Sequence, residues 1–530
     1  MKILRLQLCI LAAAGIAWAQ TPCEKLAGLS LPNTKITLAQ TVAAGEWTPP
    51  LAAPGGRGGP GNAGRGAGAG SGGRGSGRGV PPAQQALIKS MPAFCRISVT
   101  LTPTSDSDIK SEIWLPVSSS WNGKFEVMGN GGWAGTIPYP TQALVDGYAA
   151  GATDTGHVAS DQLFGIGHPE KIVDFGWRAV HETAVAGKAL IAAFYGSPTK
   201  ESYFNGCSTG GRQAMAAAEK YPTDFNGIAA GAGVNPNTLH HMNSMIITTL
   251  AHKDNYADYI PPSKYPMIHK AVLDKCDALD GVKDGLIENP LVCKFDPAEI
   301  QCKGEDGPSC LTKGQVELAR QFYSGSKNSR TGELIYPGYA RGTELTWGVE
   351  AGPNPEAAAI ETFRNVVFQD PNWDWRTLNM DSDMTLAVKE GKLLVDIGYD
   401  LSAFVRAGGK MLIYHGWNDG NVAAQNSINY YNNVMKAMGG ESRITNSIRL
   451  FMVPGMGHCQ GGEGAPSTFD KAAVVDAWVT TGKAPDKIIG SHLTDDKLDR
   501  TRPLCPYPQI AKYKGAGSTD DAANFSCAKP

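Results

Sequence analysis

The sequence has no strong excess of charge of either sign. Its 530 residues carry 48 Lys and Arg against 50 Asp and Glu, a formal net charge of −2, so no long-range field draws the molecule onto phosphate or anionic lipid. It also lacks an apolar run of the about 17 residues needed to cross a bilayer. We therefore expect no nucleic-acid partner and no membrane anchor. Hydrophobic residues make up 42% of the chain, which excludes disorder throughout.

The first 19 residues have the pattern of a signal peptide. Lys2 and Arg5 precede an apolar run from Leu6 to Ala17, and Ala17-Trp18-Ala19 has the Ala-x-Ala form that signal peptidases cleave. A membrane anchor is the alternative, but the run is too short for one. The sequence therefore predicts that residues 1–19 are removed and that the mature protein is secreted or periplasmic.

The cysteines fit an oxidising compartment. Of the 11 cysteines, Cys9 lies in the predicted signal peptide, and an even number left in an exported protein predicts disulfides. Local spacing favours three short loops, a fourth bond can join the flanks of a low-complexity tract, and a long-range pair remains. The predicted pairs are Cys276–Cys293, Cys302–Cys310, Cys505–Cys527, Cys23–Cys95 and Cys207–Cys459.

Residues 54–82 form the low-complexity tract, which has no acidic side chain and consists almost only of Gly, Ala, Arg, Ser and Pro. Such a composition cannot bury a core. Its arginines, Arg57, Arg65, Arg74 and Arg78, suit a basic arm that binds an acidic polymer or nucleic acid. The alternative is a flexible surface loop between two paired strands. We favour the loop, because so few charges bind a polyanion weakly.

After the tract, the hydrophobic pattern predicts an α/β sandwich. Two runs alternate apolar and polar residues, as half-buried antiparallel strands do. Later runs are short, apolar and bounded by turns, and helical stretches at Trp177–Tyr195 and Arg212–Lys220 separate some of them, which is typical of a mainly parallel sheet covered on both faces. The predicted strands are 96–101, 110–115, 124–128, 148–153, 202–205, 227–230, 410–414 and 448–453.

One interval interrupts this alternation. Residues 236–394 contain four cysteines, acidic turns and many aromatic residues without a regular repeat of strand and helix. We interpret them as an inserted second domain. The catalytic domain would then consist of residues 20–235 and 395–530.

A nucleophile elbow follows the predicted strand 202–205. Gly206-Cys207-Ser208-Thr209-Gly210 matches G-x-S-x-G and leads into good helix formers from Arg212, which is the strand, turn and helix context of an α/β-hydrolase. Flanking glycines are needed because the turn is too tight for a Cβ on either side. The motif predicts Ser208 as a nucleophile.

A serine nucleophile needs an imidazole to take its proton and a carboxylate to orient that imidazole. In α/β-hydrolases the order along the chain is Ser, acid, His. His458 lies in a glycine-rich loop directly after the strand 448–453, and Asp419 lies in the loop after the strand 410–414. Singly, each residue is more often a turn former or a solvated side chain. Together and in this order they predict a triad of Ser208, His458 and Asp419.

Two further features surround the predicted triad. Cys207 precedes Ser208 and Cys459 follows His458, so a serine and a histidine in contact would bring these cysteines within the Cα separation of a disulfide, about 5 to 6 Å. The oxyanion of an acyl-transfer reaction needs backbone N–H donors. We expect these from Thr209 and from a loop at the end of the strand 124–128. The predicted donors are Thr209 with either Gly131 or Gly132.

An acidic loop in the inserted domain suits calcium. Three aspartates lie within ten residues, with glycines that permit tight turns, and hard oxygen ligands at this spacing favour Ca²⁺. The loop is shorter than an EF-hand and lacks its final bidentate Glu, and an acidic surface turn is the alternative. The predicted ligands are Asp277, Asp280 and Asp284 with the carbonyls of Val282 and Leu286.

These motifs resemble those of the tannase and feruloyl esterase family of secreted serine esterases. The resemblance rests on the segments 152–157 (ATDTGH), 174–178 (DFGWR), 206–213 (GCSTGGRQ), the Asp277 loop and 457–459 (GHC), and the tract 54–82 is a departure from it. It implies an α/β-hydrolase domain, a lid inserted between nucleophile and acid, a structural calcium in that lid, and a disulfide between the neighbours of Ser208 and His458.

The resemblance also implies a carboxylic ester hydrolase acting on esters of aromatic acids, of the hydroxycinnamic or gallic type, as small esters or on plant polymers. Terephthalate monoesters are an alternative substrate, and a serine peptidase on the same fold or a non-catalytic calcium-dependent plant-polymer binding module is an alternative function. Trp347, Trp373 and Trp375 can stack on a phenolic ring, although core packing is the commoner role of such residues. Asp154, His157 and Arg178 recur in the family, and we expect them to support the oxyanion loop.

Overall fold

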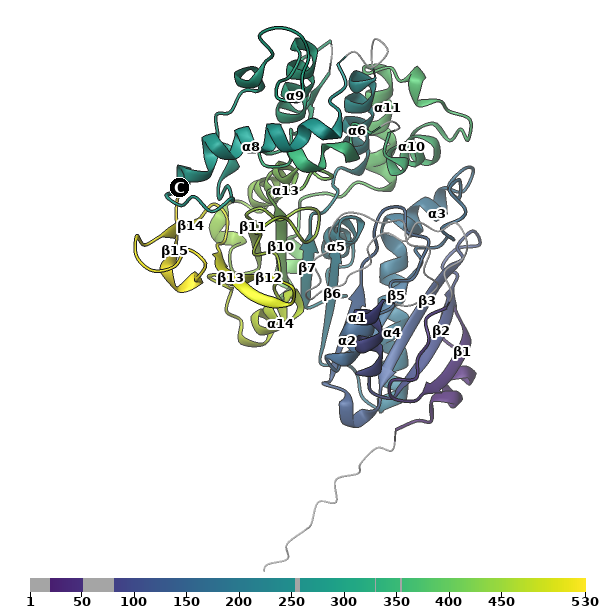
Figure 1. Ribbon diagram of the computed structural model, residues 1–530. Coiled ribbons are helices and arrows are strands. Elements are labelled where there is room, and N and C mark those ends of the chain that lie inside the picture. Colours follow the sequence, from purple (N-terminus) through teal and green to yellow (C-terminus); the bar gives the residue numbers. More distant parts are fainter. Residues whose placement is uncertain (1–19, 51–80, 253–257, 329, 353–354) are drawn as a thin grey trace, which may run out of the picture.

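The computed structural model describes residues 20–50, 81–252, 258–328, 330–352 and 355–530. The predicted signal peptide and nearly all of the tract 54–82 lie outside these residues. A nine-stranded sheet runs in the order β1-β2-β3-β5-β4-β6-β7-β10-β11 (Figure 1). The pairs from β1 to β5 are antiparallel, whereas those from β5 through β4 to β11 are parallel.

Every strand predicted from the sequence is present in this sheet. An additional strand, β1, pairs antiparallel with β2 and was missed because its residues are polar and partly exposed. The tract 54–82 follows β1 and precedes β2, as expected for a loop between paired strands, although its last residue, Pro82, begins α1. The strands are β1 (Thr34–Val42), β2 (Phe94–Leu101), β3 (Ile109–Pro116), β4 (Lys124–Met128), β5 (Ala149–Thr153), β6 (Glu201–Cys207), β7 (Gly227–Gly231), β10 (Lys410–Gly416) and β11 (Ile448–Val453).

Alternate side chains of the parallel strands pack into a core on each face of the sheet. In β10, Met411 and Ile413 join one core, and Leu412 and Tyr414 join the other. Each such fully buried apolar side chain contributes about 1.5–3 kcal/mol. Helices α4 (Ala179–Tyr195), α5 (Thr209–Lys220) and α13 (Ala424–Ala437) cover the first face, and α2 (Thr141–Val145) and α14 (Lys471–Thr481) cover the second. The predicted α/β sandwich is confirmed.

Between β7 and β10 the described residues from Asn237 to Leu394 form mainly helices, and we refer to this segment as the insertion. Figure 1 shows its teal and green helices grouped at one end of the molecule. They enclose a separate core that includes Met242, Phe322 and Trp347. After the insertion, α12 (Ser402–Arg406) packs back against the sheet through Phe404. The elements of the insertion are α6 (Asn237–Ala251), α8 (Tyr265–Cys276), α9 (Lys313–Ser324), β8 (Ser326–Lys327), β9 (Leu334–Tyr336), α10 (Ala357–Thr362) and α11 (Ser382–Leu394).

Short elements and disulfides complete the fold. All five predicted cysteine pairs are bonded, and Cys505–Cys527 links the two C-terminal hairpins. Within the described ranges, the structure contains no helix that combines the length and the apolar character needed to span a bilayer. The remaining elements are α1 (Pro82–Lys89), α3 (Pro169–Val173), β12 (Ile488–Thr494), β13 (Lys497–Leu504), β14 (Ile510–Tyr513) and β15 (Phe525–Ala528).

Buried Glu126 on β4 yields a prediction about stability. Burial, opposed by a hydrogen bond from Asn205 and reinforced by Asp146, raises its pKa from 4.5 to about 7. As pH rises the unfolded chain loses this proton first, so the native state is progressively destabilised between pH 4.5 and 7, by about 3 kcal/mol at higher pH. Glu126→Gln should therefore raise the free energy of unfolding by up to that amount at pH 8 and by little at pH 4.

Urea denaturation with the disulfides intact measures this difference. Glu201→Gln, which changes a partly exposed carboxylate at the start of the neighbouring strand β6, is the control and should show a much smaller dependence on pH. An equal effect of Glu126→Gln at both pH values would contradict the assignment.

Candidate active site

Ser208 occupies a strained turn between β6 and α5. Its backbone has φ 63° and ψ −122°, a conformation that is costly for a residue with a side chain. The Ser208 N–H donates to the Gly231 carbonyl at 2.9 Å, and the Arg212 N–H donates to the Ser208 carbonyl at 3.0 Å. A Cβ on Gly206 would lie 2.6 Å from the Gly210 oxygen, which explains the glycine there. Strand, turn and helix thus follow one another as the motif predicts.

Asp419 is fully buried in the loop after β10 and accepts four hydrogen bonds. Its Oδ2 accepts from His458 Nδ1 at 2.8 Å and from His415 Nε2 at 3.0 Å. Its Oδ1 accepts from the backbone N–H groups of Asn421 and Val422, each at 2.9 Å. Burial alone would raise the pKa of Asp419, but the charge of His458 and the bonds from both imidazoles hold it well below its ordinary value. The carboxylate is therefore ionised.

His458 follows β11, and its side chain keeps 27% of its surface exposed. Because Nδ1 donates to Asp419, the neutral ring carries its lone pair on Nε2. Burial lowers the pKa of His458, but the charge and hydrogen bond of Asp419, with the charge of Glu356, outweigh burial and raise it. An oriented, partly accessible imidazole with increased basicity is suited to accept a proton.

The Cys207–Cys459 disulfide links the last residue of β6 to the loop after β11. The two Cα atoms are 5.9 Å apart although 252 positions separate them in the sequence. Ser208 follows one cysteine directly, and His458 precedes the other. Their backbones are therefore held at the same edge of the sheet, where Asp419 also lies.

His415 was not predicted to belong to the site. Its Nε2 lies 3.0 Å from both Asp419 Oδ2 and the Val422 carbonyl, which are acceptors only, so Nε2 carries a proton. Its Nδ1 then accepts from the Ser427 hydroxyl at 2.7 Å. In the sequence, the only signal was its position four residues before Asp419, near the end of β10.

The loop after β4 packs against the start of α5. The Gly210 N–H donates to the Asn130 carbonyl and the Thr209 hydroxyl donates to the Gly132 carbonyl, both at 2.7 Å. Thr209 is the first residue of α5, so its own N–H has no partner within the helix. Gly132 lines the pocket next to Ser208, whereas Gly131 does not belong to the lining residues of the described chain.

Of the three residues expected to support this loop, His157 contacts it directly. His157 Nε2 donates to the Trp133 carbonyl at 2.6 Å, and burial lowers the pKa of His157 to about 4, so the ring is neutral. Asp154 Oδ1 accepts the Gly156 N–H at 2.8 Å. Arg178 bonds the buried Asp174 at 2.5 Å. A supporting role of Asp154 and Arg178 for the loop stays a prediction.

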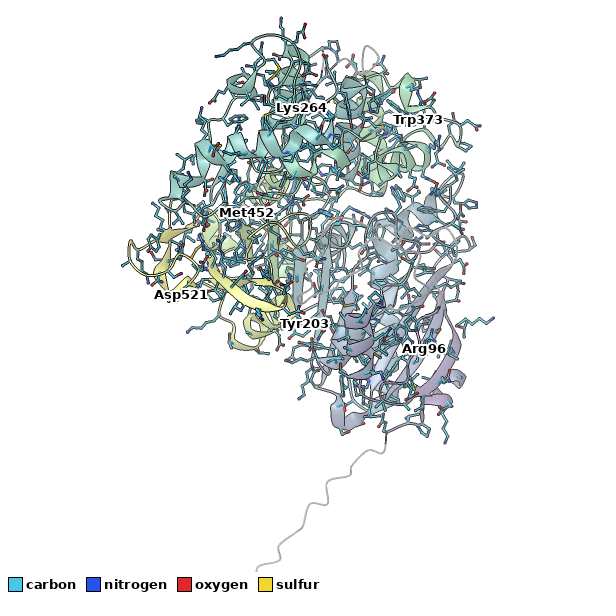
Figure 2. The ribbon with its side chains drawn as sticks, in the orientation of Figure 1. Arg96, Tyr203, Lys264, Trp373, Met452 and Asp521 are labelled. Carbon is cyan, nitrogen blue, oxygen red and sulfur yellow. A yellow bond between two sulfur atoms is a disulfide. The ribbon has the colours of Figure 1, made fainter. Side chains whose placement is uncertain are left out.

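A pocket opens beside Ser208 between the sheet and the insertion. Trp347 and Trp373 pack in the core of the insertion, and Trp375 packs against it. Figure 2 labels Trp373 among the helices of the insertion. Within the described chain, none of these three tryptophans lines the pocket. The lining residues are Gly132, Trp133, Phe175, Ser208, Thr209, Val234, Asn237, His240, His241, Glu356, Ala358 and Asn421.

Three titratable residues of the insertion in this pocket were also missed by the sequence analysis. His240, His241 and Glu356 offer ligand atoms within 4.8 Å of one another, and two imidazoles with a carboxylate suit a transition metal such as zinc. Burial lowers the pKa of His240 to about 4 and that of His241 well below its ordinary value, so both rings are neutral. Adjacent histidines at the start of a predicted domain gave no periodic or spacing signal.

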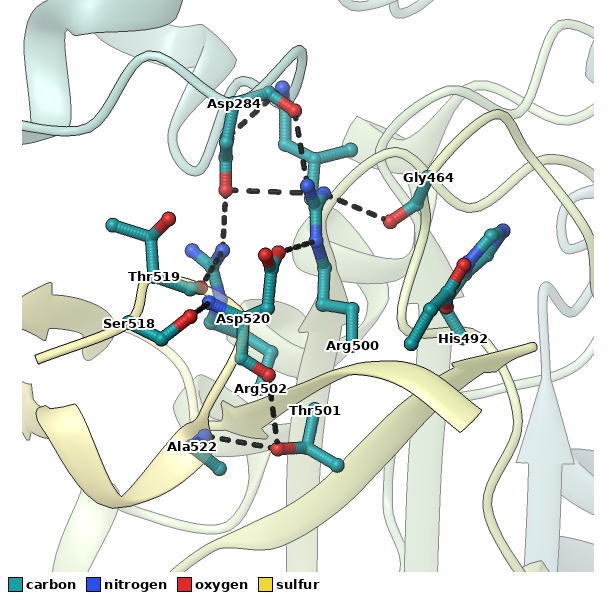
Figure 3. Close-up of polar contacts among 12 residues, drawn as sticks. Asp284, Gly464, His492, Arg500, Thr501, Arg502, Ser518, Thr519, Asp520 and Ala522 are labelled. Atoms are coloured by element: carbon teal, nitrogen blue, oxygen red, sulfur yellow. Dashed lines mark hydrogen bonds and ion pairs between the residues drawn. The ribbon is translucent and has the colours of Figure 1, made fainter. Parts of the chain in front are cut away.

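The acidic loop of the insertion folds around Asp277. Its two carboxylate oxygens accept the N–H groups of Asp284 and Gly285 at 3.1 and 3.0 Å. Asp284 faces Arg500 and Arg502 of β13, and bonds Arg502 directly (Figure 3). Val282 and Leu286, whose carbonyls are the other predicted ligands, make backbone hydrogen bonds within the loop. The Val282 N–H donates to Asp280 at 2.9 Å, and the Leu286 N–H donates to Asp284 at 3.2 Å.

Comparisons with known proteins identify the family. The family described as tannase and feruloyl esterase matches residues 95–528. A protein named "Probable feruloyl esterase B-1" from Aspergillus terreus is 35% identical, over 82% of this chain and 86% of its own. An uncharacterised esterase of Xanthomonas campestris pv. campestris is also 35% identical, over 99% of this chain and 95% of its own.

A solved structure agrees with this result. Feruloyl esterase B from Aspergillus oryzae superposes with a TM-score of 0.83 at 28% identity, covering 96% of this chain and 99% of that one. The predicted α/β-hydrolase sandwich is thereby confirmed. The chain belongs to the tannase and feruloyl esterase family and is a carboxylic ester hydrolase.

Proposed function

We propose that this esterase acts through a triad of Ser208, His458 and Asp419. Ser208 attacks the ester carbonyl while His458 Nε2 takes its proton, and Asp419 orients the imidazole and stabilises its charge. His458 then gives the proton to the leaving alcohol, and water hydrolyses the acyl-enzyme by the reverse sequence. The backbone N–H groups of Thr209 and Gly132 stabilise the oxyanion, and we choose Gly132 over Gly131 because it lines the pocket.

The observation that carries this proposal is the 2.8 Å bond between His458 Nδ1 and buried Asp419. It fixes the tautomer in which Nε2 is the base. The disulfide between the residues adjoining His458 and Ser208 supports the pairing of that base with this serine. A binding module with a vestigial elbow would have no need of an ionised, fully buried carboxylate behind its histidine.

We further propose esters of aromatic acids, of the hydroxycinnamic or gallic type, as substrates. The names of the relatives support this class, as do Trp133 and Phe175, whose stacked rings are 4.3 Å apart in the pocket lining. The insertion contributes five of the lining residues, Asn237, His240, His241, Glu356 and Ala358, so it acts as a lid that selects the acid. Terephthalate monoesters are the alternative.

Calcium in the acidic loop is a separate proposal. Asp277, Asp280 and Asp284 with the carbonyls of Val282 and Leu286 would hold the ion, which would stabilise the loop without entering the reaction. The residues fit a cation by charge: these three carboxylates and buried Glu288 interact with one another and with Arg502. Burial, with the charges of the neighbouring acids, raises the pKa of Asp280 to about 6 and of Glu288 to about 7, and a divalent cation would offset this cost of the ionised carboxylates.

Export to the periplasm or the medium completes the proposal. The predicted signal peptide, residues 1–19, supports it from the sequence. Five disulfides support it from the structure, since such bonds persist in oxidising compartments.

A covalent probe tests the nucleophile. A fluorophosphonate should label the wild-type protein at Ser208, and Ser208→Ala should abolish labelling and lower kcat/KM for methyl ferulate by at least about 10⁴-fold. Ser382→Ala, which changes an exposed serine on α11, is the matched control and should leave both unchanged. Peptide mapping of the labelled protein locates the adduct, and labelling of folded Ser208→Ala would refute the assignment.

The pH dependence tests the acid. kcat/KM should rise with pH as His458 loses its proton, at a pKa raised above the ordinary 6.5. Asp419→Asn removes the main cause of that rise and leaves burial, so the rising limb should move to lower pH while the maximum falls by about 10⁴-fold. A pH profile of kcat/KM measures both effects, and a rising limb that stays in place would count against Asp419.

Thermal unfolding tests the calcium site. Ca²⁺ should raise Tm relative to EGTA, by a free energy of about 2.7 kcal/mol at one hundred times its Kd. Asp280→Asn should remove the increase, whereas Asp274→Asn, an exposed aspartate on α8 outside the loop, should keep it. Equal Tm values for the wild type in Ca²⁺ and in EGTA would exclude a calcium site.

A further inference from the structure

The pocket beside Ser208 contains polar groups that the catalytic steps do not use. Glu356 Oε1 accepts from Asn421 Nδ2 at 3.3 Å, but Glu356 Oε2 is buried and has no hydrogen-bond partner. His240 keeps only 1% of its surface exposed, and its Nδ1 is buried without a partner as well. A polar atom left in this condition costs free energy, about as much as a lost hydrogen bond. Both residues line the pocket, so a ligand that enters it can supply the missing partner once these side chains shift toward it.

The surroundings of these atoms define which partner is suitable. Glu356 interacts electrostatically with ionised Asp419 and with Glu350, a fully buried acid of the insertion. None of the lining residues in the described chain is Lys or Arg. The Arg212 guanidinium lies 4.9 Å from the Phe175 ring, but Arg212 is buried and does not line the pocket. A ligand group at this place must therefore donate a hydrogen bond without bringing negative charge.

The other walls suit a flat ring. Trp133 and Phe175 stack on each other at one side, and Val234 and Ala358 add apolar surface. Trp133 Nε1 donates to the Ala358 carbonyl at 2.9 Å, so this bond joins the aromatic wall to the segment that carries Glu356. An aromatic acyl group attached through its carbonyl at Ser208 can then lie along this wall with its ring substituents toward the insertion.

We propose that Glu356, with His240 beside it, receives the hydroxyl of a phenolic acyl group and rejects an acyl group that ends in a carboxylate. This inference rests on the proposed function and narrows its substrate class. A phenolic O–H donates to the Glu356 carboxylate, and its oxygen can accept from the neutral His240 ring. A terephthalate carboxylate would instead place a negative charge beside ionised Asp419 and the unpaired oxygen of Glu356 in a low-dielectric site. The geometry thus favours hydroxycinnamic and gallic esters over terephthalate monoesters.

Three substrates that differ at the ring separate the two effects. These are methyl 4-hydroxycinnamate, methyl cinnamate and monomethyl terephthalate, assayed at pH 8 with a chelator present so that no metal bridges His240 and Glu356. The wild type should prefer the hydroxylated ester over methyl cinnamate by about tenfold or more in kcat/KM, because the analogue without the hydroxyl leaves the polar atoms unpaired. It should hydrolyse monomethyl terephthalate more slowly than methyl cinnamate.

Two variants of Glu356 test each effect. Glu356→Gln keeps an acceptor but replaces one carboxyl oxygen by an NH₂ donor, so the rate with monomethyl terephthalate relative to methyl cinnamate should rise about tenfold. Glu356→Leu removes the acceptor, so the preference for the hydroxylated ester should fall to about twofold or less. Ratios are compared because loss of Glu356 also lowers the pKa of His458, which affects all esters alike. Glu361→Gln, a partly buried acid on α10 outside the pocket, is the matched control and should keep the wild-type ratios.

The outcomes separate this inference from the function it rests on. If the wild type hydrolyses all three esters with equal kcat/KM, or if the Glu356 variants keep the wild-type ratios, the inference is wrong. The proposed esterase activity is then still supported. If no ester is hydrolysed and Ser208 is not labelled, the proposed function is wrong and the inference falls with it. A wild-type preference for monomethyl terephthalate would reverse the inference directly.

Discussion

The Cys207–Cys459 disulfide is the bond on which the arrangement of the site depends. It closes a loop with a sequence separation of 252, for which the chain-entropy model gives about 5 kcal/mol of stabilisation. Both bonded residues adjoin a proposed catalytic group, and the whole insertion lies between them. A covalent link therefore holds the backbones beside Ser208 and His458 together. The strained turn at Ser208 is held before the residue by this bond and the hydrogen bond to Gly231, and after it by the hydrogen bond from the Arg212 N–H.

Electrostatics then distinguish two neighbouring acids, Asp419 and Glu356. Asp419 is fully buried, yet the charge of His458 and the hydrogen bonds from both imidazoles hold its pKa low, and its own charge raises the basicity of His458. Glu356 receives one hydrogen bond, from Asn421, and burial raises its pKa. Desolvation therefore acts on both acids, but only at Asp419 do the imidazoles outweigh it. Both carboxylate oxygens of Asp419 accept hydrogen bonds without substrate, whereas Glu356 Oε2 has no hydrogen-bond partner.

Much of the fold and of the proposed triad could be predicted from local sequence. Short apolar runs bounded by turns located the strands, and the glycines around Ser208 located the elbow because a Cβ at Gly206 has no room. The order of Ser208, Asp419 and His458 along the chain, with the cysteines beside Ser208 and His458, then predicted the triad. β1 was missed because it is an edge strand with a polar, partly exposed surface. His415 and Glu356 were missed because their roles arise from contacts with loops that local patterns do not describe.

The insertion leaves the sheet after β7 and returns through β10, and these two strands are direct neighbours in the parallel sheet. The two ends of the insertion therefore join neighbouring strands of the sheet, as the ends of a loop between adjacent strands do. His240 and Glu356 lie within it, whereas the proposed nucleophile, base and acid all lie on the scaffold. A substitution within this segment can therefore change the wall of the pocket without moving the strand ends that carry the proposed nucleophile, base and acid.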